Sequence, residues 1–573
     1  MPRAHRQFLV GLWIASLLAT ACVALPNGVG GPQLSANIQG APTRTPFQPL
    51  SNTPLPSTPV PSALAATLPA PAAGIGLWVD SNLPPGVQAA LRLPVVFSLT
   101  SNASQATLRL EVGGGQTLSR WVYSLVAPFP TLATGVSAQD LLAYWQGKSS
   151  GPFAGRPLLL DEGTLQVFTR LWGEPAAGAV QVLPADKLLE TAWKQRNAWA
   201  IVPFEAVEPR WKVLDIDGNS PLHKDFNLEQ YPLAVPLVLH GSQPLAEAVL
   251  RLYGPGSQEA LLPPSNRDPQ RLAVVAMTGV TALVRATAAT MERRGILYPG
   301  KDVRDWLRNA DLTHISNEVP FARNCPVPDP FQADMRFCSD PRYIALLEDV
   351  GTDVVELTGD HFQDWGESAM LYTLDLYRQR GWGYYGGGED QEDGRRPLKV
   401  EVNGNRLAFV GCNAKGGSYA QAGPNHPGAA PCAGNWMAAE VRQLRAQGYL
   451  PIATFQHNEY YTYQAQADEK RDFRSMAEAG AVIVSGSQAH QPQAFEFDNG
   501  ALIHYGLGNL FFDQYDVSLA TRQAFIDRHV FYDGRYLGVE LLPIMFVDYA
   551  RPRPMTPGER DDLLRSVFSA SGW

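Results

Sequence analysis

The stretch Val354 to Gly366, VVELTGDHFQDWG, joins a short β-branched run to a polar turn. The run predicts a buried strand, and the turn after it carries Asp360, His361 and Asp364. In open α/β sheets, ligands bind outside the carboxyl ends of the strands. A carboxylate beside an imidazole at such a place can hold a metal ion or move a proton, so this turn is a candidate site.

Two further segments repeat this arrangement of an apolar run followed by polar residues. PIATFQHNEYY carries His457 and Glu459 after its apolar run, and AVIVSGSQAHQPQ carries Gln488 and His490. Predicted strands and helices alternate from about residue 271 onward, which indicates an α/β fold. The three histidines are therefore expected at the ends of three strands of one domain.

Length and charge limit the classes of function that need to be considered. A chain of 573 residues is too long for a single hydrophobic core. Its formal net charge of −9, without a Lys/Arg-rich block after the N-terminus, argues against nucleic acid as a partner. We predict two folded α/β domains, residues 74–265 and 266–573, preceded by an export signal and a tether.

Residues 1–22 have the pattern of an export signal. Basic residues precede an apolar stretch from Phe8 to Leu18, which is shorter than a typical transmembrane helix. The following LATAC resembles a bacterial lipobox, in which Cys22 would be lipidated and would anchor an extracytoplasmic protein to the membrane. Ordinary secretion is the alternative, because Ala19 stands where a lipobox usually has leucine.

Residues 23–73 consist mainly of Pro, Thr, Ser and Ala and carry almost no charge. Such a segment cannot bury enough apolar surface to offset the entropy lost on ordering, and its prolines favour an extended backbone. We expect a tether that holds the folded domains away from the membrane surface.

The domain 74–265 is predicted to consist of short strands and amphipathic helices. The succession of WAIVPFEAVEP, WKVLDIDG and YPLAVPLVLHG resembles type 2 periplasmic solute-binding domains. That resemblance implies a small-molecule ligand. An accessory α/β domain that binds no solute is the alternative.

Five blocks follow one another between about Val274 and Asp516: DLTHISNEVP, GTDVVELTGDHFQDWG, FQHNEYYTY, AGAVIVSGSQAHQPQ and IHYGLGNLFFDQ. Their order resembles the poly-gamma-glutamate capsule biosynthesis protein CapA family. The resemblance implies a fold like that of calcineurin-type metallophosphatases and a divalent metal. It also implies an anionic cell-surface polymer or its precursor as partner, together with other capsule-synthesis membrane proteins.

The resemblance and the chemistry of the side chains assign roles at the strand ends. Donors suited to Zn, Mn or Fe form the expected metal set, Glu318, Asp360, His361, His457 and His490. The residues expected to act in catalysis are His361, Asp364 and Glu459. The residues expected to bind substrate are Asn317, Tyr460, Gln488 and Asn509.

Four positions depart from the family pattern. Val280 stands where the family has a metal-ligating aspartate, Asp360 replaces an asparagine, and Ser487-Gln488 replace two histidines. Because valine cannot ligate a metal, one ion is expected rather than two. The same departures motivate an alternative, a lipoprotein of the cell envelope that binds polymer or acts as a scaffold without catalysis.

The leading hypothesis is an exported enzyme of capsule or poly-gamma-glutamate-type polymer synthesis and export. Its metal would assist hydrolysis or transfer at a phosphoester or an amide. A histidine after a strand is more often a hydrogen-bonded structural residue than a ligand, so each histidine also has a structural alternative. The glycine-rich GWGYYGGG, residues 381–388, is predicted to be a loop.

Four cysteines remain after Cys22. We predict the disulfides Cys325–Cys338 and Cys412–Cys432, because loop-closure entropy favours local pairing among the three connectivities. A Cys/His zinc site is the alternative. The cysteines lack the close CxxC spacing typical of zinc sites, and an exported protein meets oxidising conditions, which favours disulfides.

Overall fold

The computed structural model describes residues 74–148, 151–153, 155 and 157–573, all of which belong to one compact unit. The predicted export signal, the tether and Cys22 lie outside the described residues. In the described part of the chain, no helix has both the length and the apolar character needed to cross a bilayer.

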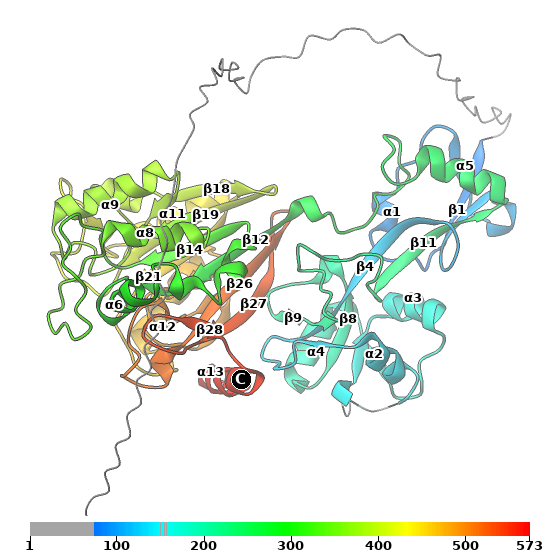
Figure 1. Cartoon of the computed structure of the whole chain (residues 1–573). Coiled ribbons are helices and arrows are strands. Elements are labelled where there is room, and N and C mark those ends of the chain that lie inside the picture. The colour runs from blue at the N-terminus through cyan, green and yellow to red at the C-terminus, as the bar shows by residue number, and fades with distance from the viewer. Residues whose placement is uncertain (1–73, 149–150, 154, 156) are drawn as a thin grey trace, which may run out of the picture. The chain divides into compact units, whose positions relative to one another are not determined.

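The strands between residues 75 and 241 build one large sheet and one small pair (Figure 1). The large sheet has the order β2-β1-β3-β11-β4-β8-β6-β7, and β9 pairs with β4. Its strands are β1 Ile75–Val79, β2 Phe97–Leu99, β3 Leu108–Val112, β4 Thr117–Pro128, β6 Leu158–Leu160, β7 Val180–Val182, β8 Trp199–Pro203, β9 Trp211–Val213 and β11 Ala234–Gly241, and the pair is β5 Gly135–Val136 with β10 Asp215–Ile216. Strand β6 runs parallel to β7 and β8, so the carboxyl ends of these three strands lie at one edge.

Five helices accompany these strands: α1 Val87–Ala90, α2 Ala138–Trp145, α3 Glu162–Trp172, α4 Leu188–Gln195 and α5 Gln243–Tyr253. Helix α3 begins directly after β6 because the side chain of Asp161 accepts a hydrogen bond from the Thr164 amide, 2.8 Å away. It ends at Gly173, whose φ of 82° is unfavourable for other residues. Its Val167 and Phe168 are buried in the core of this region.

The strands from residue 272 onward form two main sheets. The first has the order β16-β15-β14-β12-β26-β27-β28, with β13 paired to β14 and β25. Its strands are β12 Leu272–Thr278, β13 Val280–Thr281, β14 Leu312–Asn317, β15 Val354–Glu356, β16 Gly383–Tyr385, β25 Asn509–Phe511, β26 Gln523–Tyr532, β27 Arg535–Phe546 and β28 Pro552–Pro554. Strands β13, β14, β15 and β16 pair in parallel, and β26 and β27 extend the sheet in antiparallel fashion.

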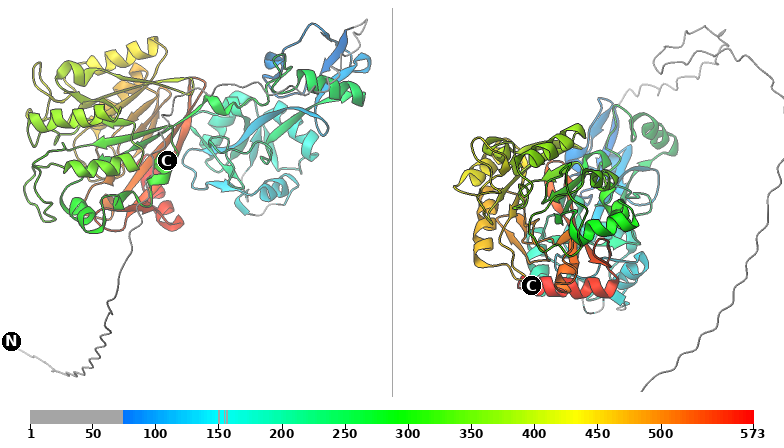
Figure 2. Two further views of the ribbon diagram at one scale, coloured as in Figure 1. Left: turned by 45° about the horizontal axis from the view of Figure 1, so that its top comes forward. Right: turned by 60° about the vertical axis from the view of Figure 1, so that its left-hand side comes forward.

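The second sheet has the order β18-β19-β21-β22-β24-β23. Its strands are β18 Leu398–Val402, β19 Asn405–Asn413, β21 Leu450–Gln456, β22 Ile483–Ser485, β23 Phe495–Asp498 and β24 Ala501–His504, and a small separate pair joins β17 Gly387–Gly388 to β20 Gly428–Ala429. The four strands β19, β21, β22 and β24 run parallel to one another. Figure 2 shows the strands of both sheets from two further directions.

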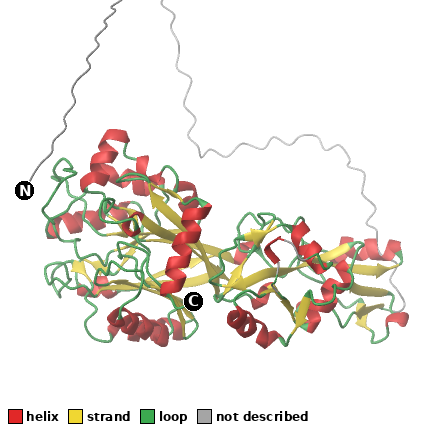
Figure 3. Ribbon diagram, turned by 90° about the horizontal axis from the view of Figure 1, so that it is seen from below, coloured by secondary structure: helices red, strands yellow, loops and turns green. Residues whose placement is uncertain are grey.

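The two sheets pack face to face, with helices on their outer sides (Figure 3). Successive side chains of a strand point to opposite faces. Accordingly, Val275 of β12 joins Phe409 and Ile452 in the core between the sheets, whereas Ala276 packs beneath the helices. The helices are α6 Arg285–Arg294, α7 Arg304–Arg308, α8 Ile344–Asp349, α9 Glu367–Gln379, α10 Gln391–Arg395, α11 Trp436–Ala446, α12 Ala467–Ala479 and α13 Pro557–Ala570.

The glycine-rich segment 381–388 is not the loop that its composition predicts. It contains strand β16, which pairs in parallel with β15, and strand β17. The aromatic ring of Tyr385 is fully buried, and this burial stabilises the strand despite the flanking glycines, which disfavour it. Gly386 and Gly387 allow close backbone approach, because a Cβ on them would lie 2.6 Å from Thr358 and 2.5 Å from Leu357.

Both predicted disulfides are present, which confirms the local pairing of the cysteines. Cys325–Cys338 closes a loop of 13 residues, and Cys412–Cys432 closes one of 20 residues. Cys412 is the penultimate residue of β19, so the second bond ties the end of this strand to the loop before α11.

Replacing Cys412 and Cys432 together by alanine should lower stability by roughly 3 kcal/mol, since a cross-link across a loop of this size restricts the unfolded chain by about that much. The corresponding fall in the melting temperature is about 6–12 °C. Differential scanning calorimetry measures it, with a Cys325→Ala/Cys338→Ala variant as the matched comparison. Unchanged melting in both variants would show that neither bond forms in solution.

Candidate active site

Six ionisable side chains gather where strands of both sheets in the C-terminal region end. We call this group the candidate site; it comprises Glu318 after β14, Asp360 and His361 after β15, Lys415 after β19, Glu459 after β21 and His490 after β22. The strands that carry them are parallel within each sheet, so their carboxyl ends meet at one edge. The first sheet contributes three of these side chains and the second sheet contributes the other three.

Glu318, Asp360 and His361 are close enough to bind one metal ion. Each offers one ligand atom, and these atoms all lie within 4.8 Å of one another. Glu318 and Asp360 are 2% and 6% exposed, so water compensates their charges poorly. Asp360 accepts a hydrogen bond from Nε2 of Gln456, 2.9 Å away, which fixes one of its oxygens.

The imidazole of His361 is oriented by Asp364. Its Nδ1 donates to Oδ2 of Asp364 across 2.7 Å, which leaves Nε2 for a ligand. Burial alone would lower the pKa of His361, but the bond to Asp364 and the charges of Glu318 and Asp360 raise it to about 9. Asp364 also accepts from the backbone amide of Phe337, 2.9 Å away, so the pair is held in place.

Glu318 carries the least compensated carboxylate of the group. Burial raises its pKa above the usual range of a glutamate, and the charge of Asp360 adds to this effect. Its Oε1 is buried and has no hydrogen-bond partner among the described residues. A buried carboxylate oxygen without a partner is costly, and a bound cation would remove that cost.

Lys415 is a member of the site that the sequence motifs did not reveal. Its Nζ lies 2.8 Å from Oδ2 of Asp360 and also pairs with Oε1 of Glu459. Although burial lowers the pKa of a lysine, these two carboxylates raise the pKa of Lys415 above its usual value. The clue in the sequence was its position two residues after β19, before Gly416 and Gly417, but a single lysine in such a loop has no motif.

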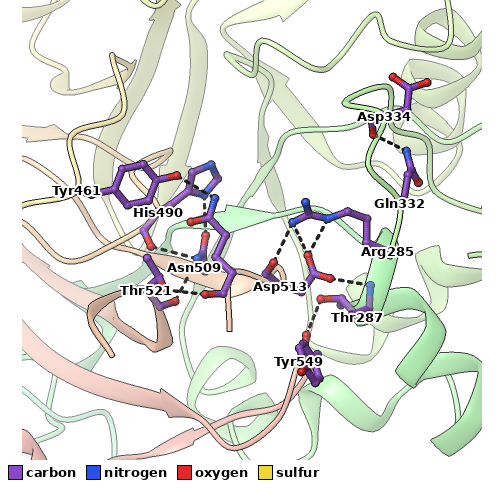
Figure 4. A network of polar contacts seen from close by, with 12 residues as sticks. Arg285, Thr287, Gln332, Asp334, Tyr461, His490, Asn509, Asp513, Thr521 and Tyr549 are labelled. Atoms are coloured by element: carbon purple, nitrogen blue, oxygen red, sulfur yellow. Dashed lines mark hydrogen bonds and ion pairs between the residues drawn. The ribbon is translucent and has the colours of Figure 1, made fainter. Parts of the chain in front are cut away.

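His490 lies near Glu459 and is oriented by Asn509. Figure 4 shows His490 beside Asn509. Its Nδ1 lies 2.9 Å from Oδ1 of Asn509, whose Nδ2 donates to the carbonyl of His490, 3.1 Å away. This assigns the proton of His490 to Nδ1 and leaves a lone pair on Nε2, which is 3.8 Å from Oε1 of Glu459. Burial lowers the pKa of His490, so the ring is neutral at pH 7.

Two of the sequence-predicted residues point elsewhere. Nε2 of His457 pairs with Oδ2 of Asp472 on α12, 3.0 Å away, and the hydroxyl of Tyr460 donates to Asp468 on the same helix, 2.6 Å away. Tyr461 instead donates to Oε2 of Glu459, 3.1 Å away. The loop after β21 thus divides its polar side chains between the site and helix α12.

The other predicted substrate-binding residues are all buried. Asn317 donates to the carbonyl of Val319 and to the hydroxyl of Tyr377, so its amide nitrogen serves the local fold. Gln488 is 2% exposed, and neither atom of its amide has a hydrogen-bond partner among the described residues. Asn509 acts through His490, whose ring it orients.

Val280, where the family resemblance calls for an aspartate, belongs to a small apolar cluster with Phe337 and Phe512. The ring of Phe337 lies 4.9 Å from that of His361, and the ring of Phe512 lies 5.2 Å from that of His490. The position of the family's aspartate is therefore occupied by a buried apolar side chain rather than by a carboxylate.

The donor set of carboxylate oxygens and an imidazole nitrogen is compatible with a divalent cation. It offers the unpartnered Glu318 oxygen, an oxygen of Asp360 and Nε2 of His361. The Asp364–His361 pair is the carboxylate–histidine arrangement that commonly supports metal ligands. Lys415 opposes a cation, because its ammonium already neutralises part of Asp360.

Comparison with known proteins gives a family match for this region. Residues 274–514 match the model of the family described as bacterial capsule synthesis protein PGA_cap. The capsule biosynthesis protein CapA of Bacillus anthracis is 22% identical over 306 residues, which cover 52% of this chain and 73% of that protein. The PGA biosynthesis protein CapA of Bacillus subtilis (strain 168) is 23% identical over 202 residues, or 35% of this chain and 52% of that protein.

Solved structures show weaker likenesses. A 5'-nucleotidase precursor from Thermus thermophilus aligns with 52% of this chain and 58% of its own, with a TM-score of 0.31 and 13% identity. An ABC-type phosphate transport receptor from Vibrio cholerae aligns with 31% of this chain and 91% of its own, with a TM-score of 0.25 and 13% identity. Both scores are too low to support a conclusion about the fold. The chain's own strands and helices confirm the α/β class predicted from the sequence.

The five sequence blocks between Val274 and Asp516 thus coincide with the region that the family model matches. The resemblance inferred from them is confirmed for this region, because residues 274–514 match the model of the bacterial capsule synthesis protein family PGA_cap.

Proposed function

We propose that the C-terminal region is a metal-dependent hydrolase or transferase of capsule polymer synthesis, acting on a phosphoester or an amide of an anionic envelope polymer or its precursor. The observation that carries this proposal is the convergence of Glu318, Asp360 and His361, with ligand atoms within 4.8 Å of one another. The relatives named capsule and PGA biosynthesis proteins support the substrate class.

Glu318, Asp360 and His361 would hold the ion. A divalent metal in such a site polarises a phosphoryl or carbonyl oxygen and lowers the pKa of bound water. Asp364 accepts a hydrogen bond from the proton-bearing Nδ1 of His361 and so leaves Nε2 available as a ligand. We propose one ion rather than two, because the Val280 cluster offers no ligand on its side of the site.

His490 is suited to act as the base of this site. Its neutral ring has the lone pair on Nε2, beside Glu459, so it can take a proton from an attacking water or hydroxyl group. Asn509 holds this tautomer, and Phe512 packs against the ring. The low pKa that burial gives His490 keeps the base unprotonated at neutral pH.

The charge of the site explains why an anionic substrate would need the metal. Four carboxylates, Glu318, Asp360, Asp364 and Glu459, face the cationic Lys415 and the protonated His361. The excess is negative, so a polymer of carboxylates or phosphates is repelled until another cation enters. The ammonium of Lys415 could then contact a substrate oxygen from the side of Asp360 and Glu459.

Lys415 also favours a second function, a polymer-binding or scaffolding protein without catalysis. Its ammonium pairs with Asp360 and Glu459, so it occupies carboxylate oxygens that a metal ion would need as ligands. Together with Val280, this gives a site that is filled by the chain's own side chains. Metal content distinguishes the two functions.

For the whole chain we propose an envelope-associated, extracytoplasmic protein anchored through lipid on Cys22. The family match and the capsule proteins among the relatives support an envelope role, and the LATAC motif supports the anchor. Other membrane proteins of polymer synthesis are the expected partners. The tether, residues 23–73, would give the folded domains reach above the bilayer.

Elemental analysis of the purified protein should find about one equivalent of Zn, Mn or Fe. His361→Ala and Glu318→Gln should abolish binding, Asp364→Asn should weaken it about 10–100-fold, and His457→Ala should leave it intact. Because a ligating His361 must lose its proton, metal affinity should rise between pH 7 and about 9. Absence of metal after incubation with each ion would support the scaffolding function instead.

If the ion is bound, hydrolysis of a phosphodiester or a γ-glutamyl anilide should require it. His490→Gln should then reduce kcat by about 10²-fold or more, the usual contribution of a general base, while metal content stays unchanged. Activity at the wild-type level in His490→Gln would rule out this residue as the base.

Lys415→Met should strengthen metal binding by about tenfold, since a competing ammonium worth about 1.4 kcal/mol is removed from Asp360 and Glu459. Lys415→Arg keeps the charge and should bind metal like the parent. Isothermal titration with Mn²⁺ measures both. Weaker binding in Lys415→Met would mean that the lysine supports the metal rather than competing with it.

Cys22→Ala should move the protein from the membrane fraction to the soluble extracytoplasmic fraction, because lipid on Cys22 is the proposed anchor. Immunoblots of fractionated cells measure this, and Ala19→Leu, which restores the usual lipobox residue, is the control. Retention of the Cys22→Ala variant in membranes would exclude lipidation of Cys22 as the anchor.

A further inference from the structure

The N-terminal region contains a large cavity that the proposed function does not use. Its volume is about 1020 Å³, and all of its lining residues fall between Pro85 and Trp211. The segments that follow β6, β7 and β8 contribute Asp161, Leu183 and Glu205 to its wall. The cavity therefore lies at the carboxyl ends of three strands linked by parallel pairing, where α/β sheets bind ligands.

The charged side chains of this cavity are almost all acidic. Its carboxylates are Asp161, Glu162, Asp186, Glu190, Glu205 and Glu208. The one cationic residue in the lining is Arg210, whose guanidinium pairs with Glu190 across 2.6 Å and with Glu208 across 3.2 Å. The remaining excess of negative charge disfavours phosphate, carboxylate and polyanionic ligands.

The rest of the wall is largely hydrocarbon. Apolar side chains from β7, α4, β8 and β9 take part, namely Val182, Leu188, Leu189, Val202 and Trp211. A wall with carboxylates at several points and aliphatic carbon between them matches a ligand with cationic ends and an apolar middle. A bare metal ion would gain nothing from contact with the hydrocarbon and is far too small to fill a cavity of this volume.

The buried phenol of Tyr123 lies close to two carboxylates of the cavity wall, Asp161 and Glu205, although Tyr123 itself is not among the lining residues. Tyr123 of β4 is fully buried, and its hydroxyl has no hydrogen-bond partner of good geometry among the described residues. It lies by the first turn of α3: burial, together with the charges of Asp161 and Glu205, raises the pKa of Tyr123, and the adjacent Thr164 hydroxyl donates to Asp161.

The carboxylate of Glu205, in another part of the cavity wall, is held in a fixed orientation. Nδ2 of Asn266 donates to both of its oxygens, at 3.0 and 3.1 Å, and so fixes the plane of the carboxylate. Although the residue is open to the cavity, the protein around it limits hydration and raises its pKa. An ammonium group would restore the lost solvation.

We infer that this cavity binds a small aliphatic amine, a chain of methylene groups that carries a protonated amine at one or both ends. Ammonium groups would pair with Glu205 and with the carboxylates at the start of α3, and the methylene chain would lie on the apolar wall. The inference is independent of the metal site, because none of its residues belongs to the candidate site.

Three compounds with the same five-carbon chain test this inference on the full-length protein: 1,5-diaminopentane, 1,5-pentanediol and glutarate. Isothermal titration calorimetry should detect binding of the diamine alone, and its affinity should fall when NaCl is raised from about 50 to about 500 mM, as screening predicts. Equal binding of the diol, preference for glutarate, or no binding of the diamine would each overturn the inference.

Variants locate the binding in this cavity. Glu205→Gln and Glu162→Gln should each weaken diamine binding by about tenfold, while Glu174→Gln, which lies beyond the C-terminal end of α3 and outside the lining, should have no effect. Glu162 is exposed, so its variant remains informative if Glu205→Gln proves unstable by thermal melting. Unchanged affinity in a folded Glu162→Gln and Glu205→Gln pair would place the amine elsewhere and refute the assignment.

Discussion

The candidate site depends on the face-to-face packing of the two sheets in the C-terminal region. Apolar side chains such as Val275, Phe409 and Ile452 hold the sheets together, and burying each stabilises the fold by about 1.5–3 kcal/mol. Only this packing brings Asp360 of one sheet to Lys415 and Gln456 of the other. The polar contacts between the sheets therefore depend on how the two sheets are aligned. A shift of one sheet relative to the other would separate the members of the site.

Within that frame, charge decides what the site can accept. Glu318 is buried with one oxygen unpartnered, and Asp360 shares its charge with the single ammonium of Lys415. For Glu318, the cost of burial exceeds what the nearby cations return, so burial raises the pKa of this carboxyl. A further cation would offset this cost, and the imidazole nitrogen of His361 makes a transition metal more suitable than Ca²⁺ or Na⁺.

The sequence predicted the strand ends but not the partners of every side chain found there. The run at Val354 and Val355 is continuous and apolar, so strand β15 and the turn with Asp360 and His361 could be read from it. Lys415 could not, because its partner Glu459 lies 44 residues away and the pairing is purely tertiary. His457 fits the strand-end rule equally well, yet a side-chain rotation directs it to Asp472 on α12, which no periodicity encodes.

The two acidic regions of the chain differ in the kind of cation that fits them. In the candidate site, ligand atoms within 4.8 Å of one another and nearly excluded from water suit an ion that replaces its hydration shell with carboxylate and imidazole. In the N-terminal cavity, carboxylates spread over about 1020 Å³ with hydrocarbon between them would leave a bare ion hydrated and loosely held. Spacing and wall chemistry, rather than the amount of negative charge, therefore distinguish the proposed metal site from the proposed amine pocket.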